Sequence, residues 1–301
     1  MRTVIQVLVL LGVAAFAHSE TIVFNEEAER YAVEFVQIGD VGNPQDARMD
    51  PPQGSVDYIF YIAKYELPCD GRNAAIAADA ISLQMCESQQ PALFDRLESI
   101  EFVNWLNEIS GFAPAYKIEQ QPGGGRFLFS REPGDDGYDP SNPTRNANAR
   151  YFFPTKDEFH KAAFYSPETE TYNRWSTGNI TPTDVGPEGG TDPNTVRFGG
   201  AFDLADITMA GGESAYGTVG MTGNAAEWEE PVVTEDIAFF YGREGWENFS
   251  VERLDAVNSR KILPGLPGIR LVTRTIPEPA SWAMAIPVLL IPFVGRTRRS
   301  R

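Results

Sequence analysis

The residues best suited to chemistry include a carboxylate beside a large aromatic ring. In "MTGNAAEWEE", residues 221–230, a Gly-Asn pair precedes Glu227 and Trp228. Gly-Asn is typical of a turn. A carboxylate there could be a metal ligand, a catalytic group, or a structural group that caps backbone N–H groups of its own turn.

Cysteine and histidine restrict the chemistry further. The chain has two cysteines, Cys69 and Cys86, and an even pair in an oxidising compartment most often forms a disulfide. Two free thiols or a metal pair are the alternatives. His160 is the only histidine outside the N-terminal leader region, so a His-rich zinc or iron site is excluded. A Ser-His-Asp triad would have to use His160, but no G-x-S-x-G motif is present.

Length and charge set the class of protein. The 301 residues can form one large domain or two modest ones, and the formal net charge is -17. Nucleic-acid binding is not expected, because a phosphate-binding surface needs clustered Lys and Arg. The acidic balance suits an exported protein, or one that binds cations.

The N-terminus is typical of a secretory signal. Arg2 precedes an apolar run that ends in Ala15 and Ala17 at A-x-A spacing, which predicts a signal peptide over residues 1–19. A first transmembrane helix is the alternative, but the run is shorter than the ~20 residues that a span requires.

The C-terminus contains a second targeting pattern. Pro277, Glu278 and Pro279 are followed by an apolar run over residues 280–294 and then by four arginines. In these residues the segment 276–301 resembles the PEP-CTERM sorting signal of bacterial envelopes. The resemblance implies processing by an exosortase, and a simple C-terminal anchor is the alternative. We expect membrane contact only through this segment.

The intervening chain has few strongly periodic stretches. Strand-like patterns occur within residues 21–38 and 56–67, and residues 73–85 favour a helix. Apolar residues at spacings of three and four predict a second helix over 93–106. Thr155 and Glu158 form a T-x-x-E capping box, which gives Glu158 a structural role. Residues 121–148 and 166–220 are loop-like.

Five segments in order resemble a known family. They are "YIAKYEL" (61–67), "FVNWL" (102–106), "FFPTKDEFHKAAFY" (152–165), "AYGTVGMTGNAAEWEE" (215–230) and "GIRLV" (268–272). Together they resemble the formylglycine-generating enzyme family, or sulfatase-modifying factor domain, over roughly residues 22–275.

The resemblance implies a single α+β domain over residues 20–275, irregular and loop-rich, of the C-type-lectin-like kind. Trp105, Phe159 and Trp228 would be core aromatics. Arg270 would be a buried or semi-buried anchor.

The catalytic residues of the family are not carried over. The generating enzymes hold copper with two cysteines in the C-terminal third, but residues 229–270 contain no cysteine. Cys69 and Cys86 lie at positions that do not match that motif, and the iron-dependent branch of the fold uses several histidines. We therefore expect no copper and no catalysis of either type. A divergent oxidoreductase acting on a protein cysteine is the alternative, with Cys69 and Cys86 as a relocated metal pair.

Calcium is a separate implication of the resemblance. The generating enzymes bind calcium beside the corresponding turn, and the matching positions here are Gly223, Ala225 and Glu227. Gly220 replaces an Asp or Asn of the family pattern, which removes one side-chain ligand. Asn194 and Asp203 are candidates for a second site.

These features predict an exported, non-catalytic binding or structural module of the bacterial cell envelope or extracellular matrix. Its partner would be an extracellular polysaccharide, an envelope protein or a matrix component. A lectin-like sugar binder is a further alternative, with four aromatics as stacking candidates: Tyr172, Trp175, Tyr216 and Trp246.

Overall fold

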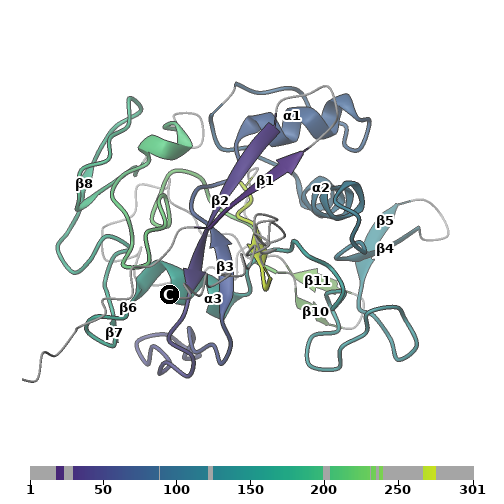
Figure 1. Ribbon diagram of the computed structural model, residues 1–301, viewed down its shortest axis with the longest axis horizontal. Helices are drawn as coiled ribbons and strands as arrows, with labels where there is room; N and C mark the ends of the chain where they lie inside the picture. Colours follow the sequence, from purple (N-terminus) through teal and green to yellow (C-terminus); the bar gives the residue numbers. More distant parts are fainter. Residues whose placement is uncertain are drawn as a thin grey trace, which may run out of the picture.

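The computed structural model has mixed helices and small sheets (Figure 1). It describes residues 18–23, 30–87, 89–120, 125–198, 204–230, 232–234, 237–239 and 267–275. Most of the predicted signal peptide and all of the predicted sorting segment, with Pro277, Glu278 and Pro279, lie outside these residues.

The largest sheet joins the two ends of the described chain. Its strands run antiparallel in the order β1-β2-β3-β12. Their bounds are β1 His18–Val23, β2 Arg30–Ile38, β3 Phe60–Ala63 and β12 Val272–Thr273. Apolar residues of β2 and β3, such as Phe35 and Phe60, are buried, because these two strands lie against the core. On its other side, β12 bridges Phe152 through Val272.

Helix α2 confirms the predicted apolar stripe, shifted by three residues. It spans Arg96–Ile109, and the Asp95 side chain caps it by accepting from the N–H groups of Leu97 and Glu98. Phe102 is fully buried in the core. Trp105 packs against the core while remaining partly exposed.

Helix α1 differs from the prediction of a helix over residues 73–85. It spans Cys69–Ala77 and is followed by Asp79, whose φ of 55° lies in the left-handed region. The stretch up to Cys86 has no regular structure, because Asn73 binds both backbone polar groups of Cys86 through its side chain. Apolar composition alone did not reveal this competing interaction.

Helix α3, Lys156–Phe164, confirms the predicted capping box. Thr155 accepts from Glu158 N, and Glu158 accepts from Thr155 N in return. Phe159 is 1% exposed, as expected for a core aromatic. His160 and Phe164 lie four positions apart and so share one face of the helix.

The other elements are short ribbons. Several of them lie in the two segments predicted as loop: β5, which pairs with β4 to form a hairpin, falls within 121–148, and β7, β8, β9 and the 3₁₀ helix η1 fall within 166–220. The remaining bounds are β4 Lys117–Gln120, β5 Arg126–Phe129, β6 Tyr165–Ser166, β7 Thr171–Tyr172, β8 Thr183–Asp184, β9 Thr195–Val196, the 3₁₀ helix η1 Ile207–Met209, β10 Val232–Thr234 and β11 Ile237–Phe239.

The long irregular segment occupies one side of the molecule. In Figure 1 the loops around β8 lie opposite the hairpin β4–β5 and helix α2, with the sheet and α3 between them. Among the described residues, no helix has both the length and the apolar character needed to cross a membrane. The architecture is therefore an α+β, loop-rich domain.

Candidate functional site

Glu227 lies in a buried ion pair with Arg270. Its carboxylate oxygens accept from Arg270 Nε at 3.0 and 3.1 Å, and Oε1 also accepts from Nη2 at 2.7 Å. Arg270 also donates to the carbonyl oxygens of Ala63, Lys64 and Val219. The guanidinium, 0% exposed, thus joins the end of β3, the 221–230 turn and the segment that leads into β12.

The turn itself is bound by Glu66, a residue that sequence analysis did not single out. Glu66 Oε1 accepts from Ala225 N at 2.9 Å, and Oε2 accepts from Asn224 Nδ2 at 2.6 Å. Gly223 is required here, because a Cβ atom would lie 2.0 Å from the carbonyl oxygen of Arg197. The turn is therefore packed against backbone on one side and a buried carboxylate on the other.

Two carboxylates share one guanidinium in this cluster. Burial raises the pKa of Glu66 to about 8, and repulsion from Glu227 adds to the effect. Arg270 and the hydrogen bonds from Ala225 and Asn224 act in the opposite direction. Protonated Glu66 is thus favoured in the folded protein at a pH where the unfolded chain would be ionised.

This pKa predicts that folding stability falls as pH rises from about 5 to about 8. In that window the folded state holds a proton on Glu66 that the unfolded state has lost, so the slope approaches about 1.4 kcal/mol per pH unit. Glu66→Gln carries no charge and should flatten the slope in urea unfolding at pH 5, 6.5 and 8. Glu108→Gln, at an exposed position of α2, is the control. Equal slopes for wild type and Glu66→Gln would contradict the prediction.

The predicted calcium residues have different surroundings. Gly223, Ala225 and Glu227 lie in one turn, but both Glu227 oxygens accept from Arg270. Asn194 lies just before β9, and its amide donates to Thr181 O at 3.4 Å. The described residues contain no group of three or more His, Cys, Asp or Glu that could hold a metal ion. Asp203 lies outside the described residues.

The two cysteines form a disulfide. Cys69, the first residue of α1, is bonded to Cys86 across a sequence separation of 17. Because these are the only cysteines of the chain, neither is a free thiol in this structure.

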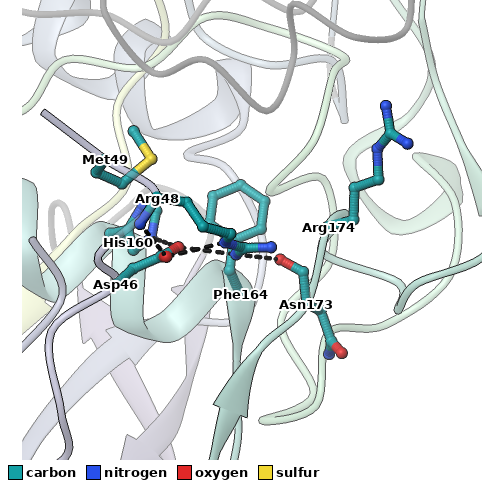
Figure 2. A pocket seen from close by; sticks show the side chains of 7 residues that line it. All are labelled: Asp46, Arg48, Met49, His160, Phe164, Asn173 and Arg174. Carbon is teal, nitrogen blue, oxygen red and sulfur yellow. Dashed lines mark hydrogen bonds and ion pairs between the residues drawn. The ribbon is translucent and has the colours of Figure 1, made fainter. Parts of the chain in front are cut away.

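A separate pocket of about 240 Å³ is built around His160 (Figure 2). Three parts of the chain meet there: the loop after β2, the buried face of α3, and the residues after β7. The lining residues are Asp46, Arg48, Met49, His160, Phe164, Asn173 and Arg174.

The floor of the pocket is a chain of polar contacts. His160 Nε2 lies 3.0 Å from Asp46 Oδ2, and both side chains are almost fully buried. Arg48 donates to both Asp46 oxygens at 2.9 and 2.8 Å, and to the carbonyl oxygen of Asn173 at 3.0 Å. Figure 2 shows Arg48 lying between Asp46 and Asn173, while Arg174 extends away from this group.

The electrostatics favour an ionised Asp46. Burial raises its pKa, but the hydrogen bonds from His160 and Arg48, with the charge of Arg48, lower it more, so that the pKa lies well below its usual value. The result is a fixed carboxylate that orients an imidazole and a guanidinium.

The arrangement suits binding better than nucleophilic catalysis. An Asp-His pair can act in acid–base chemistry. However, the seven described residues of the lining include no Ser, Thr or Cys beside the imidazole. Guanidinium groups and an amide next to Met49 and Phe164 instead offer polar recognition beside apolar walls, as small-molecule sites do.

Of the aromatic residues that are candidates for sugar stacking, Tyr172 lies beside the residues of this pocket. Tyr172 is half-buried, with its ring 5.1 Å from that of His160. Tyr216 is also half-buried and donates to Asp40. Trp175 is 0% exposed, so its ring is not accessible for stacking on a sugar. Trp246 lies outside the described residues.

The sequence marks His160 as a lone histidine without assigning it to a site, and it does not reveal the partners of His160. Asp46 is separated from it by 114 residues and lies in a loop without periodicity. Only the lone histidine was a usable signal.

Comparison with known proteins supports the fold class only. No protein-family model matches the chain, and no curated protein matches it. Treponema denticola variable protein 1 is similar in structure, with a TM-score of 0.52, 19% sequence identity, and coverage of 85% of this chain and 99% of that one. The crystal structure of CarF is similar with a TM-score of 0.51, 17% identity, and coverage of 81% and 99%. At these identities the likeness concerns the fold alone.

Proposed function

We propose that this protein is an exported, non-catalytic binding module of the bacterial cell envelope or extracellular matrix. Its fold would be the C-type-lectin-like form of the sulfatase-modifying factor domain. The ordered motifs at 61–67, 102–106, 152–165, 215–230 and 268–272 support this finer assignment. The two terminal segments support export through a signal peptide and sorting by an exosortase.

One observation carries the proposal: the pocket on the Asp46–His160 pair is polar, fixed and without a nucleophile in its described lining. An extracellular polysaccharide is the partner that this chemistry favours. Sugar hydroxyls can accept from guanidinium and amide N–H groups, and Met49 and Phe164 provide apolar contact.

The alternative is an oxidoreductase that uses Cys69 and Cys86 as a relocated metal pair. The disulfide argues against it, because metal binding needs thiolates and both sulfurs are bonded to each other. Retained oxidation of a sulfatase-type cysteine peptide by the purified protein would overturn the non-catalytic proposal.

Calcium binding at Gly223, Ala225 and Glu227 stays a prediction. The geometry does not favour it, since a cation would compete with Arg270 for the same two oxygens. Equilibrium dialysis with radioactive calcium tests it directly.

The binding proposal predicts an effect of Arg174→Gln. We expect the exported protein to bind an envelope polysaccharide saturably on a glycan array, and this variant to bind about tenfold more weakly, because a charged donor at the pocket is lost. Arg96→Gln, at the exposed start of α2, is the matched control. Repeating the measurement with calcium and with a chelator shows whether polysaccharide binding at the pocket depends on calcium. Equal binding by wild type and Arg174→Gln would contradict this role of the pocket.

A further inference from the structure

A second cavity, of about 130 Å³, lies between the loop after β5 and the end of β12. A space of this size has room for several water molecules or for a compact ion. Charged and amide side chains line it together with three apolar residues: Asp139, Asn142, Arg145, Asn146, Ala147, Ala149, Arg150, Phe152, Arg274 and Thr275.

Three arginines line this cavity. Arg145 and Arg150 are only 5% and 8% exposed, whereas Arg274 is exposed. Each guanidinium lies over an aromatic ring: Arg145 is 3.6 Å from the Phe152 centroid, and Arg274 is 4.1 Å from that of Tyr58. Stacking of this kind holds the planar group in one orientation and leaves its N–H donors directed along its edge.

The neighbouring carboxylates only partly compensate this charge. Asp139 lines the cavity and accepts from Ser141 N at 2.8 Å and Ser141 Oγ at 2.7 Å. Glu230 lies 3.4 Å from Arg145 Nη1, and Glu158 is also close enough to act on Arg145 electrostatically.

The Arg145–Glu230 contact is poorly formed. Neither Arg145 Nη1 nor Glu230 Oε1 has a hydrogen-bond partner within the described part of the chain, although both are buried. Burial raises the pKa of Glu230, against the effect of Arg145, so its negative charge is disfavoured. Buried donors are normally satisfied, and an unsatisfied one calls for an explanation.

We propose that this cavity binds a compact oxyanion, held by Arg145, Arg150 and Arg274. The oxyanion is phosphate, sulfate, or the carboxylate or sulfate group of an acidic sugar. Guanidinium groups match the geometry of such anions, and the side-chain amide of Asn146 adds a neutral donor. Asn142 Nδ2 already donates to Glu230 Oε2 at 2.7 Å. On a chain with a formal net charge of -17, this is a local concentration of positive charge. The site is separate from the Asp46–His160 pocket and does not depend on the proposed function.

The test is calorimetric titration of the full chain with inorganic phosphate, with sulfate and with galacturonate, at constant ionic strength set by sodium chloride. We expect saturable binding of at least one of these oxyanions, with a dissociation constant raised about tenfold in Arg274→Gln, because one charged donor is lost. Comparing the affinity for phosphate and sulfate with the affinity for galacturonate distinguishes a free inorganic anion from the carboxylate of an acidic sugar as the ligand.

Two further variants sharpen the result. Asp139→Asn removes the carboxylate of the lining and should tighten binding roughly threefold, since repulsion is relieved while Ser141 keeps an acceptor. Arg96→Gln removes an equal charge at the start of α2 and should leave binding unchanged. The part of α2 that contacts the lining of the cavity is its other end, where Asn107 accepts from the backbone N–H of Arg150. Arg274 is exposed, so its replacement should fold normally, which circular dichroism checks. The absence of saturable binding, or an unchanged dissociation constant in Arg274→Gln, would overturn the proposal.

Discussion

Replacing Arg270 by methionine is expected to destabilise the fold by at least about 3–5 kcal/mol, the usual cost of removing one partner of a buried ion pair. Glu227 would lose its buried cation, and its charge would be left uncompensated beside the carboxyl group of Glu66. Three carbonyl oxygens, of Ala63, Lys64 and Val219, would also lose their donor. The expected loss is a large part of the 5–15 kcal/mol by which a typical domain is stable. Urea unfolding and the yield of soluble protein measure it.

The double variant Glu227→Leu/Arg270→Met identifies the cause. If the main cost is the uncompensated carboxylate, removing it should recover part of the lost stability. Arg96→Met, at an exposed position, controls for the loss of an arginine as such. The explanation would be wrong if Arg270→Met unfolded at the same urea concentration as Arg96→Met.

Removing the disulfide with Cys69→Ala/Cys86→Ala is expected to lower the free energy of unfolding by about 3 kcal/mol, the amount typical of a loop of this length. The disulfide closes a loop with a sequence separation of 17, and beyond Asp79 this loop has no regular structure. We therefore expect the cross-link to act mainly by reducing the conformational entropy of the unfolded chain. Urea unfolding with and without reductant measures the effect.

Local proteolysis gives a second readout of the same change. Met85 is 66% exposed, so its segment is accessible once it loosens. The contacts of Asn73 with the backbone of residue 86 do not involve the sulfur, so the substitution does not itself remove them. Faster cleavage near Met85 in the double variant would show that these contacts alone do not hold the segment. Identical stability of oxidised and reduced wild type would contradict the prediction.

Much of the local structure could be predicted from neighbouring residues. The capping box of Thr155 and Glu158 forms within one helical turn, and the apolar stripe of α2 depends on spacings of three and four. Helix α1 was misplaced, because the contacts of Asn73 with Cys86 span 13 residues and leave no periodic signal. The finer C-type-lectin-like assignment depends on motif order and stays a proposal.

The candidate sites were less accessible to sequence reasoning. His160 was singled out because it was alone, but Asp46 and Arg48 belong to an irregular loop. The role of Arg270 as a buried anchor was expected, whereas the binding of the turn by Glu66 was not.

By itself, the sequence determined the capping box of α3, the buried faces of α2 and α3, and the Gly-Asn turn before Glu227, because these depend on residues within a few positions of one another. Only the tertiary structure decided which partners the buried charges have. Glu227 lies 43 residues from Arg270, and Ala225 lies 159 from Glu66. A charge buried by folding must be compensated by whichever group the packed chain brings within hydrogen-bond distance, and spacing along the sequence does not encode that distance.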